Sequence, residues 1–142
     1  MKKENIKEIK GCPLQIYPRN IWVACGEEFR KDIGKCFTSI DYSELEEVGY
    51  SGGETMMVRE KECNNEIGIL IYLKNENVPE CYIVHECVHA AMDICGNLDI
   101  DYGFLNQEAL AYLTDYIYRI VTNMVHGGCD NTIPRFTKTI LL

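Results

Sequence analysis

Residues 79–96 read PECYIVHECVHAAMDICG, and they contain two of the chain's three histidines. His85 and His89 are four residues apart, so on an α-helix they lie on one face, one turn from each other. Both imidazoles can therefore bind one metal ion, at about 2.0–2.1 Å if the ion is zinc. Glu86 lies on the neighbouring flank, where its carboxylate would reach a water on the metal rather than the metal itself. The spacing predicts a helix that carries a metal site.

The residues around this motif also favour a helix. Asn77 is a good N-cap, and Glu80 three residues later completes a capping-box-like pair. Gly96 is a natural stop at the C-terminal end. Outside one polar strip almost every residue is apolar, which is typical of a helix buried on nearly all sides. The strip would then be buried too and must be paired or metal-bound; it consists of Tyr82, His85, Glu86, His89 and Asp93. A chance match with two core histidines is the alternative interpretation.

Length and composition indicate one globular domain that spans residues 1–142. The first residues are charged, and we expect residues 1–11 and 130–142 to be loose tails. The hydrophobic content of 46% is enough for a buried core. The formal net charge of −8 argues against nucleic acid as a partner, because phosphate binding needs a basic surface.

Eight cysteines invite a disulfide interpretation, but the start of the chain disfavours it. The first ten residues lack the apolar segment of a signal peptide, and no apolar run reaches the length of a membrane span. We therefore expect a cytoplasmic protein with free thiols and no membrane partner. Because the chain has no CxxC pair, a separate cysteine-based zinc site is not expected.

The pattern of apolar residues predicts an α+β fold. Four strands are predicted, at residues 14–17, 21–25, 54–61 and 67–73, the last two joined as a hairpin. Residues 27–36 favour a short helix, and Gly52-Gly53 favours a tight turn or a mobile segment. A second long helix is predicted from about Asn106 to Val125, because its apolar residues recur at helical spacing and glycines follow it. We expect a small, mostly antiparallel sheet packed against the motif helix and this second helix.

A catalytic zinc usually has three protein ligands and one open position. Glu108 lies 19 residues after His89, at the start of the second helix and away from its apolar stripe, so its carboxylate could reach across to the metal. A solvated glutamate favoured by the helix dipole is an equally good interpretation of Glu108. Asp99, Asp101 and His126 are further candidates for the third ligand, although His126 follows a helix end, where a capping role is more typical.

The pattern His85-Glu86-x-x-His89, followed about twenty residues later by a glutamate at a helix start, resembles the gluzincin motif of thermolysin-type metallopeptidases. The similarity covers about residues 67–125 and implies a zincin-like fold. It implies that His85, His89 and Glu108 bind Zn²⁺ and that Glu86 acts as general base and proton shuttle.

The same resemblance suggests roles for further residues. Asp93, four residues after His89, would accept a hydrogen bond from a histidine ligand and orient it. Residues 68–73 would form the sheet edge along which an extended substrate pairs. Tyr112 stands where the family commonly has an acid. The phenol of Tyr112 or of Tyr116 is a candidate for stabilising an oxyanion, although tyrosines on such a helix more often only pack.

These observations predict a zinc-dependent hydrolase whose substrate is a peptide or protein and whose nucleophile is a zinc-bound water. Two different functions stay open. One is a zinc-stabilised binding or regulatory domain that does not catalyse, and the second is a hydrolase of non-peptide amides. The sequence does not indicate the oligomeric state.

Overall fold

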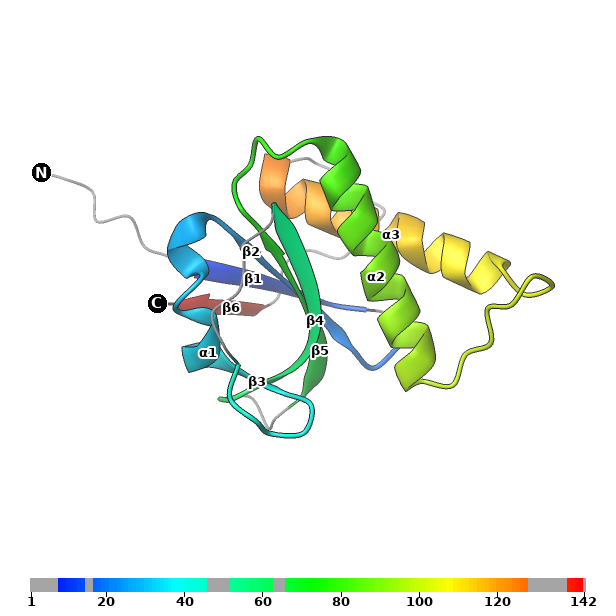
Figure 1. The fold of residues 1–142 in the computed structure, drawn as a ribbon, viewed down its shortest axis with the longest axis horizontal. Coiled ribbons are helices and arrows are strands. Elements are labelled where there is room, and N and C mark those ends of the chain that lie inside the picture. Colours follow the sequence, from blue (N-terminus) through cyan, green and yellow to red (C-terminus); the bar gives the residue numbers. More distant parts are fainter. Residues whose placement is uncertain (1–7, 15–16, 46–51, 63–65, 128–137, 142) are drawn as a thin grey trace, which may run out of the picture.

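Six strands form one sheet, and two long helices pack against it (Figure 1). The computed structural model describes residues 8–14, 17–45, 52–62, 66–127 and 138–141. In chain order the elements are β1 (Glu8–Pro13), β2 (Asn20–Cys25), the 3₁₀ helix η1 (Glu27–Phe29), α1 (Ile33–Cys36), β3 (Phe37–Ser39), β4 (Gly53–Glu60), β5 (Ile67–Leu73), α2 (Glu80–Asn97), α3 (Glu108–His126) and β6 (Lys138–Leu141). The expected α+β class is confirmed.

The sheet has the strand order β3-β4-β5-β2-β1-β6 and curls like half of a barrel (Figure 1). Its strand pairs are antiparallel except that β2 and β5 run parallel, with Ile21 beside Ile69 and Val23 beside Ile71. This parallel pair arises because the chain passes through α1, β3 and β4 before it returns beside β2. The sheet is therefore mixed, with mostly antiparallel pairs.

β5 lies in the middle of the sheet, between β4 and β2. Its residues from Gly68 to Leu73 are buried, because alternate side chains enter hydrophobic layers on opposite faces of the sheet. A strand covered on both faces has a continuous apolar sequence, which explains the composition of β5. The expectation that residues 68–73 form a sheet edge was therefore wrong, since a strand covers each side of β5.

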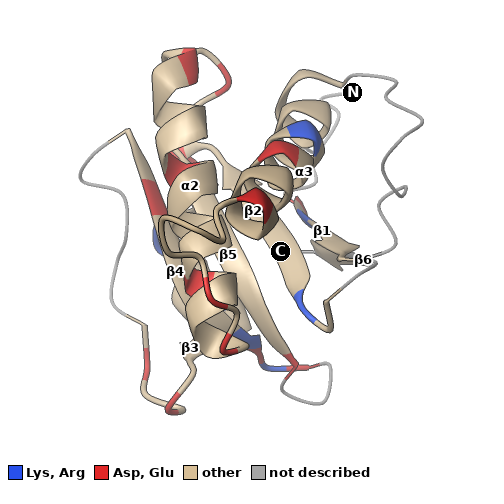
Figure 2. Cartoon of the chain, turned by 90° about the vertical axis from the view of Figure 1, so that its right-hand side faces the viewer, with Lys and Arg blue, Asp and Glu red and all other residues tan. Residues whose placement is uncertain are grey.

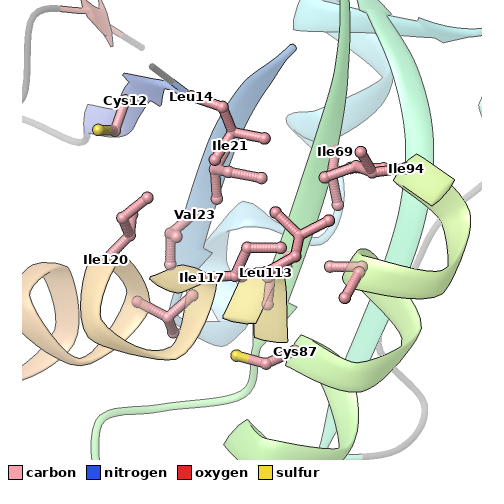
Figure 3. Packing of buried hydrophobic residues seen from close by; sticks show 14 of the residues in the cluster. Cys12, Leu14, Ile21, Val23, Ile69, Cys87, Ile94, Leu113, Ile117 and Ile120 are labelled. Atoms are coloured by element: carbon pink, nitrogen blue, oxygen red, sulfur yellow. The ribbon is translucent and has the colours of Figure 1, made fainter. Parts of the chain in front are cut away.

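Two hydrophobic clusters cover the two faces of the sheet. The first lies between the sheet and the long helices, and Ile94 of α2 and Ile117 of α3 both belong to it (Figure 3). The second lies on the opposite face, where Trp22 packs edge-to-face on Phe37 with ring centroids 5.7 Å apart. Because α2 packs on the sheet with one face and on α3 with another, its outward face has no covering layer among the described residues.

The described parts of both termini belong to the sheet. Residues 1–11 and 130–142 were expected to be loose tails, but Glu8–Pro13 forms β1 and Lys138–Leu141 forms β6. The two strands pair with each other, with Ile9 beside Ile140. Neither segment has a strong strand pattern of its own. Each is held in the sheet by a partner that lies far away in the sequence, so the sequence did not predict these strands. The expected strand at 14–17 includes two residues outside the described ranges.

The ends of α2 differ from the sequence prediction. Pro79, not Asn77, is the N-cap, and Asn77 instead donates its backbone N–H to Asn75 Oδ1 at 2.8 Å. Glu80 forms no capping box, because its carboxylate accepts a hydrogen bond from the Tyr118 hydroxyl of α3. The helix also continues past the glycine that was expected to stop it and ends at Asn97.

The glycine stop expected for α3 is confirmed. Gly127 follows His126 with φ 67°, a left-handed conformation that glycine adopts without a steric penalty. Among the described residues, no helix is long and apolar enough to cross a membrane. Free thiols are found at all six described cysteines, which are Cys12, Cys25, Cys36, Cys81, Cys87 and Cys95. The remaining two, Cys63 and Cys129, lie outside the described ranges.

Candidate metal centre

The two motif histidines meet on α2, as their spacing predicts. A 3.0 Å contact joins the Nε2 atoms of His85 and His89, and their ring planes are inclined by 76°. Two nitrogens at about 2.0–2.1 Å from a tetrahedral zinc would lie about 3.3 Å apart. The observed separation is within a few tenths of an ångström of that value. Both side chains are exposed, so an ion can reach them from solvent.

Glu86 contributes a buried carboxylate beside this pair. Its exposed fraction is 5%, and its Oε2 atom has no hydrogen-bond partner among the described residues. Desolvation raises the pKa of the Glu86 carboxyl, and the neighbouring His85 and His89 oppose that shift. Ligand atoms of the three residues all lie within 4.8 Å of one another, which makes them a group that can hold a metal ion. A buried carboxylate that leaves one oxygen without a hydrogen bond is expensive to keep, which is typical of a functional group.

The first residues of β4 form the wall opposite α2. A cavity of about 520 Å³ between them is lined by Gly52, Gly53, Cys81, Tyr82, His85 and Glu86. A Cβ atom on Gly52 would overlap the Tyr82 ring, and one on Gly53 would lie 3.1 Å from Glu86 Cγ. The double glycine therefore allows the strand to approach the helix closely, rather than serving only as a turn. Thr55 joins the two elements by donating its hydroxyl to the Glu86 backbone carbonyl at 3.1 Å.

The sheet edge beside the site belongs to β4. β3 pairs only with Val58–Glu60 of that strand. On the side away from β5, Thr55, Met56 and Met57 face no strand of the described part of the chain. An open strand edge can accept an extended peptide as an additional strand. The edge expected at residues 68–73 is thus replaced by one at residues 55–57.

The histidines were expected to be buried, and that expectation was wrong. The sequence of α2 is apolar nearly all round, yet Val84 and Val88 are 43% and 37% exposed. Only the side that carries Ile83, Cys87 and the following buried positions faces the sheet. Composition cannot distinguish a helix covered on every side from one whose outer face is apolar but open.

Glu108 is the first residue of α3 and is exposed. The metal-binding group found among the described residues contains His85, Glu86 and His89 but not Glu108. Asp101, a further candidate for the third ligand, accepts hydrogen bonds from Gly103 N at 3.1 Å and Asn106 Nδ2 at 3.0 Å. Its carboxylate therefore stabilises the loop between α2 and α3.

Asp99 and His126 are also outside this metal-binding group. Asp99 is exposed in the same loop, with φ 54°, and His126 is exposed at the far end of α3. Both positions are explained by local structure, because aspartate tolerates a left-handed turn and a histidine suits a helix C-terminus.

Asp93 and Tyr112 lie in different surroundings. Asp93 is half-buried one turn after His89, and burial raises the pKa of the Asp93 carboxyl while the histidine partly opposes that shift. Tyr112 is 71% exposed and lines a separate cavity with Leu14 and Tyr17. Asp93 is therefore close enough to His89 to feel its charge, whereas Tyr112 lines a different cavity from the one that His85 and Glu86 line.

Sequence reasoning missed three parts of the site. Cys81 lies one turn before His85 on the same face of the helix, so the sequence could have predicted that it lies beside the site. The close approach of Gly52 and the hydrogen bond of Thr55 depend on the packing of β4 against α2, for which the sequence gives no pattern. Searches of protein-family models, curated proteins and solved structures returned no match to this chain.

Proposed function

We propose that this protein is a zinc-dependent peptidase whose centre is formed by His85, Glu86 and His89. One observation carries the proposal: the two Nε2 atoms converge to 3.0 Å beside a buried carboxylate oxygen that has no other partner among the described residues. In zinc hydrolases with this pattern the two imidazoles bind the metal and the adjacent carboxylate acts as the general base.

The proposed chemistry assigns different tasks to the three side chains. Zinc held by these residues would act as a Lewis acid and would lower the pKa of a water molecule towards about 7. His85 and His89 must present unprotonated Nε2 atoms, so the hydrogen bond between them must break. The Glu86 carboxylate would accept the proton that the attacking water loses and deliver it to the departing amine, and its raised pKa suits a group that must both take and give that proton.

Among the described residues, no strand pairs with Thr55–Met57 on the side of β4 away from β5, and this edge supports a peptide as the substrate. Thr55–Met57 follow the double glycine that lines the cavity, and the Thr55 hydroxyl donates to the backbone carbonyl of Glu86. A peptide that paired with this edge would place its backbone next to α2 at the level of the catalytic carboxylate. A small amide has no extended backbone that could pair with β4, so this edge favours peptide over non-peptide substrates.

We propose Glu108 as the third zinc ligand. It starts α3, which packs on α2 and is joined to it by the loop at residues 98–107. Glu108 is outside the group of atoms within 4.8 Å, so zinc binding would have to draw the start of α3 towards the histidines. Glu108→Ala should therefore lower zinc affinity by at least roughly tenfold, as measured by competition with a coloured chelator.

The test of the peptidase proposal compares zinc-loaded wild type with Glu86→Gln on a mixture of unstructured peptides, with cleavage followed by mass spectrometry. We expect cleavage by wild type and a rate lower by roughly 10²–10⁴ in the variant, with zinc content unchanged. Glu62→Gln is the matched control, because Glu62 is exposed and follows the end of β4 opposite to the double glycine. Equal rates for wild type and Glu86→Gln would refute the mechanism.

A zinc-stabilised domain without catalysis is the second candidate. The observation in its favour is that no third ligand completes the described donor group. It predicts one zinc per chain, a large fall in melting temperature with chelator, and no peptide cleavage by wild type.

A further inference from the structure

Phe104 and Leu105 are two neighbouring apolar side chains that stand almost entirely in solvent. They are 87% and 88% exposed, the highest values among the large hydrophobic side chains of the described residues. They lie in the loop between α2 and α3, which projects beyond the sheet in Figure 1. We call this pair the apolar tip. A single exposed apolar side chain is ordinary, but an adjacent pair is typical of a surface that contacts another molecule.

Hydrogen bonds within the loop hold the apolar tip outward. The Asp101 carboxylate accepts hydrogen bonds from Gly103 N at 3.1 Å and from Asn106 Nδ2 at 3.0 Å. Gln107 donates its side-chain amide to the Phe104 carbonyl at 2.8 Å. The other apolar residues of the loop pack on the core between the sheet and the long helices; they are Leu98, Ile100 and Tyr102. The loop therefore turns its other apolar side chains inward and presents only the tip to solvent.

A pocket of matching character lies next to this loop. Its cavity of about 570 Å³ is bounded by α3, which follows the loop directly, and by the connection between β1 and β2. Most of its lining is apolar or aromatic, and we call it the tyrosine pocket; it comprises Leu14, Tyr17, Ala109, Tyr112, Leu113 and Tyr116. Tyr112 is 71% exposed, so the three most exposed large hydrophobic side chains of the described residues are the apolar tip and one wall of this pocket. The volume lies in the range of pockets that bind a ligand.

We infer that the apolar tip of one copy of this chain fills the tyrosine pocket of a second copy, which makes the protein a two-fold symmetric dimer. Tip and pocket lie at the same end of α3, because Ala109 of the pocket follows Leu105 by four residues. A two-fold axis therefore makes the contact twice, with each copy giving one tip and receiving one. An aromatic side chain seated in a pocket is typical of the anchors that hold protein interfaces together.

The charges around the tip and the pocket are complementary. Residues 98–108 carry three acids and no lysine or arginine, the acids being Asp99, Asp101 and Glu108. Figure 2, which faces the end from which the loop projects, shows acidic positions on the loop and charges of both signs on α3. Arg119 lines the pocket, where it pairs with Asp115 at 3.0 Å. Arg19 follows the pocket residue Tyr17 by two positions and donates to the neutral side-chain oxygen of Asn97 rather than to an acid. Opposite charges would therefore meet when the loop of one copy reaches the pocket of the other, which offsets the repulsion between two acidic chains.

A second copy accounts for the exposed tip and the open pocket together. In its own chain the apolar tip stays in solvent although the pocket begins one helical turn away, because the hydrogen bonds of Asp101 and Gln107 hold the loop. A small apolar ligand in the tyrosine pocket would leave the tip exposed. Contact between two copies covers Phe104, Leu105 and Tyr112 at once.

The experiment measures self-association of the full chain by sedimentation velocity from about 1 µM to about 100 µM. It needs neither zinc nor substrate, so its outcome is independent of the peptidase proposal. We expect wild type to shift from monomer to dimer within this range. Phe104→Ser with Leu105→Ser should raise the dimer dissociation constant at least roughly hundredfold, because each dimer loses the anchor twice. Ala109→Glu should do the same from the pocket side, and α3 should be retained because glutamate suits the first turn of a helix.

Ile40→Ser is the matched control. Ile40 is also an exposed apolar residue, at 40%, but it lies outside α2, α3 and their loop, so this variant should associate as wild type does. The melting temperature of each variant identifies any that associates less only because it has unfolded. A wild type that stays monomeric throughout, or a tip variant that dimerises like wild type, would overturn the inference.

A photochemical crosslink tests which surfaces meet. Phe104→p-benzoylphenylalanine is irradiated in an equal mixture of unlabelled and isotope-labelled chains. Digestion after glutamate separates Phe104 from Tyr112 at Glu108, and mass spectrometry identifies the joined peptides. We expect the peptide of position 104 joined to peptides that contain Tyr17 or Tyr112 of the other isotope form. Crosslinks between chains that avoid the tyrosine pocket, or crosslinks to the pocket only within one chain, would contradict the inference even in a dimer.

Discussion

Replacing Glu86 by glutamine should stabilise the metal-free protein while it destroys activity. Glu86 is 5% exposed, and its Oε2 atom has no partner among the described residues. Burial disfavours its charged form, so the pKa of the carboxyl is raised above the ordinary value of 4.5. Glutamine has the same shape and no charge, and it therefore removes the cost of burying a carboxylate. A protein that retains such a residue gives up stability for function.

The size of the effect follows from the burial. An unsatisfied buried polar group lowers the free energy of unfolding by about 1–3 kcal/mol. Glutamine removes the part of this cost that comes from the negative charge, which we take as about 1 kcal/mol. For a chain of this length that corresponds to a rise in melting temperature of about 3–5 °C. Because the folded-state pKa is raised, the destabilisation by Glu86 is absent below the unfolded pKa and develops as pH rises through the folded pKa.

The assay is thermal unfolding of both proteins in chelator, followed by circular dichroism from about pH 4 to about pH 8, which brackets the range over which the carboxyl ionises. The melting temperatures should coincide at the acidic end and separate as pH rises, with Glu86→Gln the more stable. Glu62→Gln, at an exposed position, should follow wild type throughout. A glutamine variant that is less stable than wild type at the alkaline end would mean that the carboxylate has a stabilising partner, and the reasoning would be refuted.

Three further outcomes are expected. Ile117→Ala should lower the free energy of unfolding by about 2–5 kcal/mol in urea titrations, because Ile117 is fully buried between α3 and the sheet; a loss below about 1 kcal/mol would contradict this packing. Brief iodoacetamide treatment at about pH 8 should modify the exposed Cys81 before Cys87, whose pKa burial raises to about 12, and peptide mass spectrometry should show that order. Gly127→Ala should cost about 1 kcal/mol in thermal unfolding, because φ is 67° there; an unchanged melting temperature would exclude that left-handed cap.

The sequence was informative about several features that are set locally, although the capping rules failed at both ends of α2. The four-residue spacing of His85 and His89 placed both rings on one face of a helix, and Gly127 ended α3 where a glycine stop was expected. The apolar run at residues 67–73 marked β5 to the residue. Each of these depends on side chains within a few residues of one another, so periodicity and capping rules apply directly.

The sequence was uninformative wherever structure depends on distant partners. The pairing of β1 with β6 joins the two ends of the chain, and neither strand has a strong pattern of its own. The central place of β5 follows from its parallel pairing with β2, which no local pattern specifies. Whether the outer face of α2 is covered depends on what packs there, so the exposure of the histidines could not be deduced from composition.

The most direct test of the central claim is the zinc content of purified protein, measured by elemental mass spectrometry after reconstitution, for wild type, His89→Ala and His126→Ala. We expect about one zinc per chain in wild type and in His126→Ala, and a large loss in His89→Ala, because the Nε2 atom of His89 contacts that of His85 whereas His126 lies at the far end of α3. Wild type without zinc, or His89→Ala with as much zinc as wild type, would contradict it.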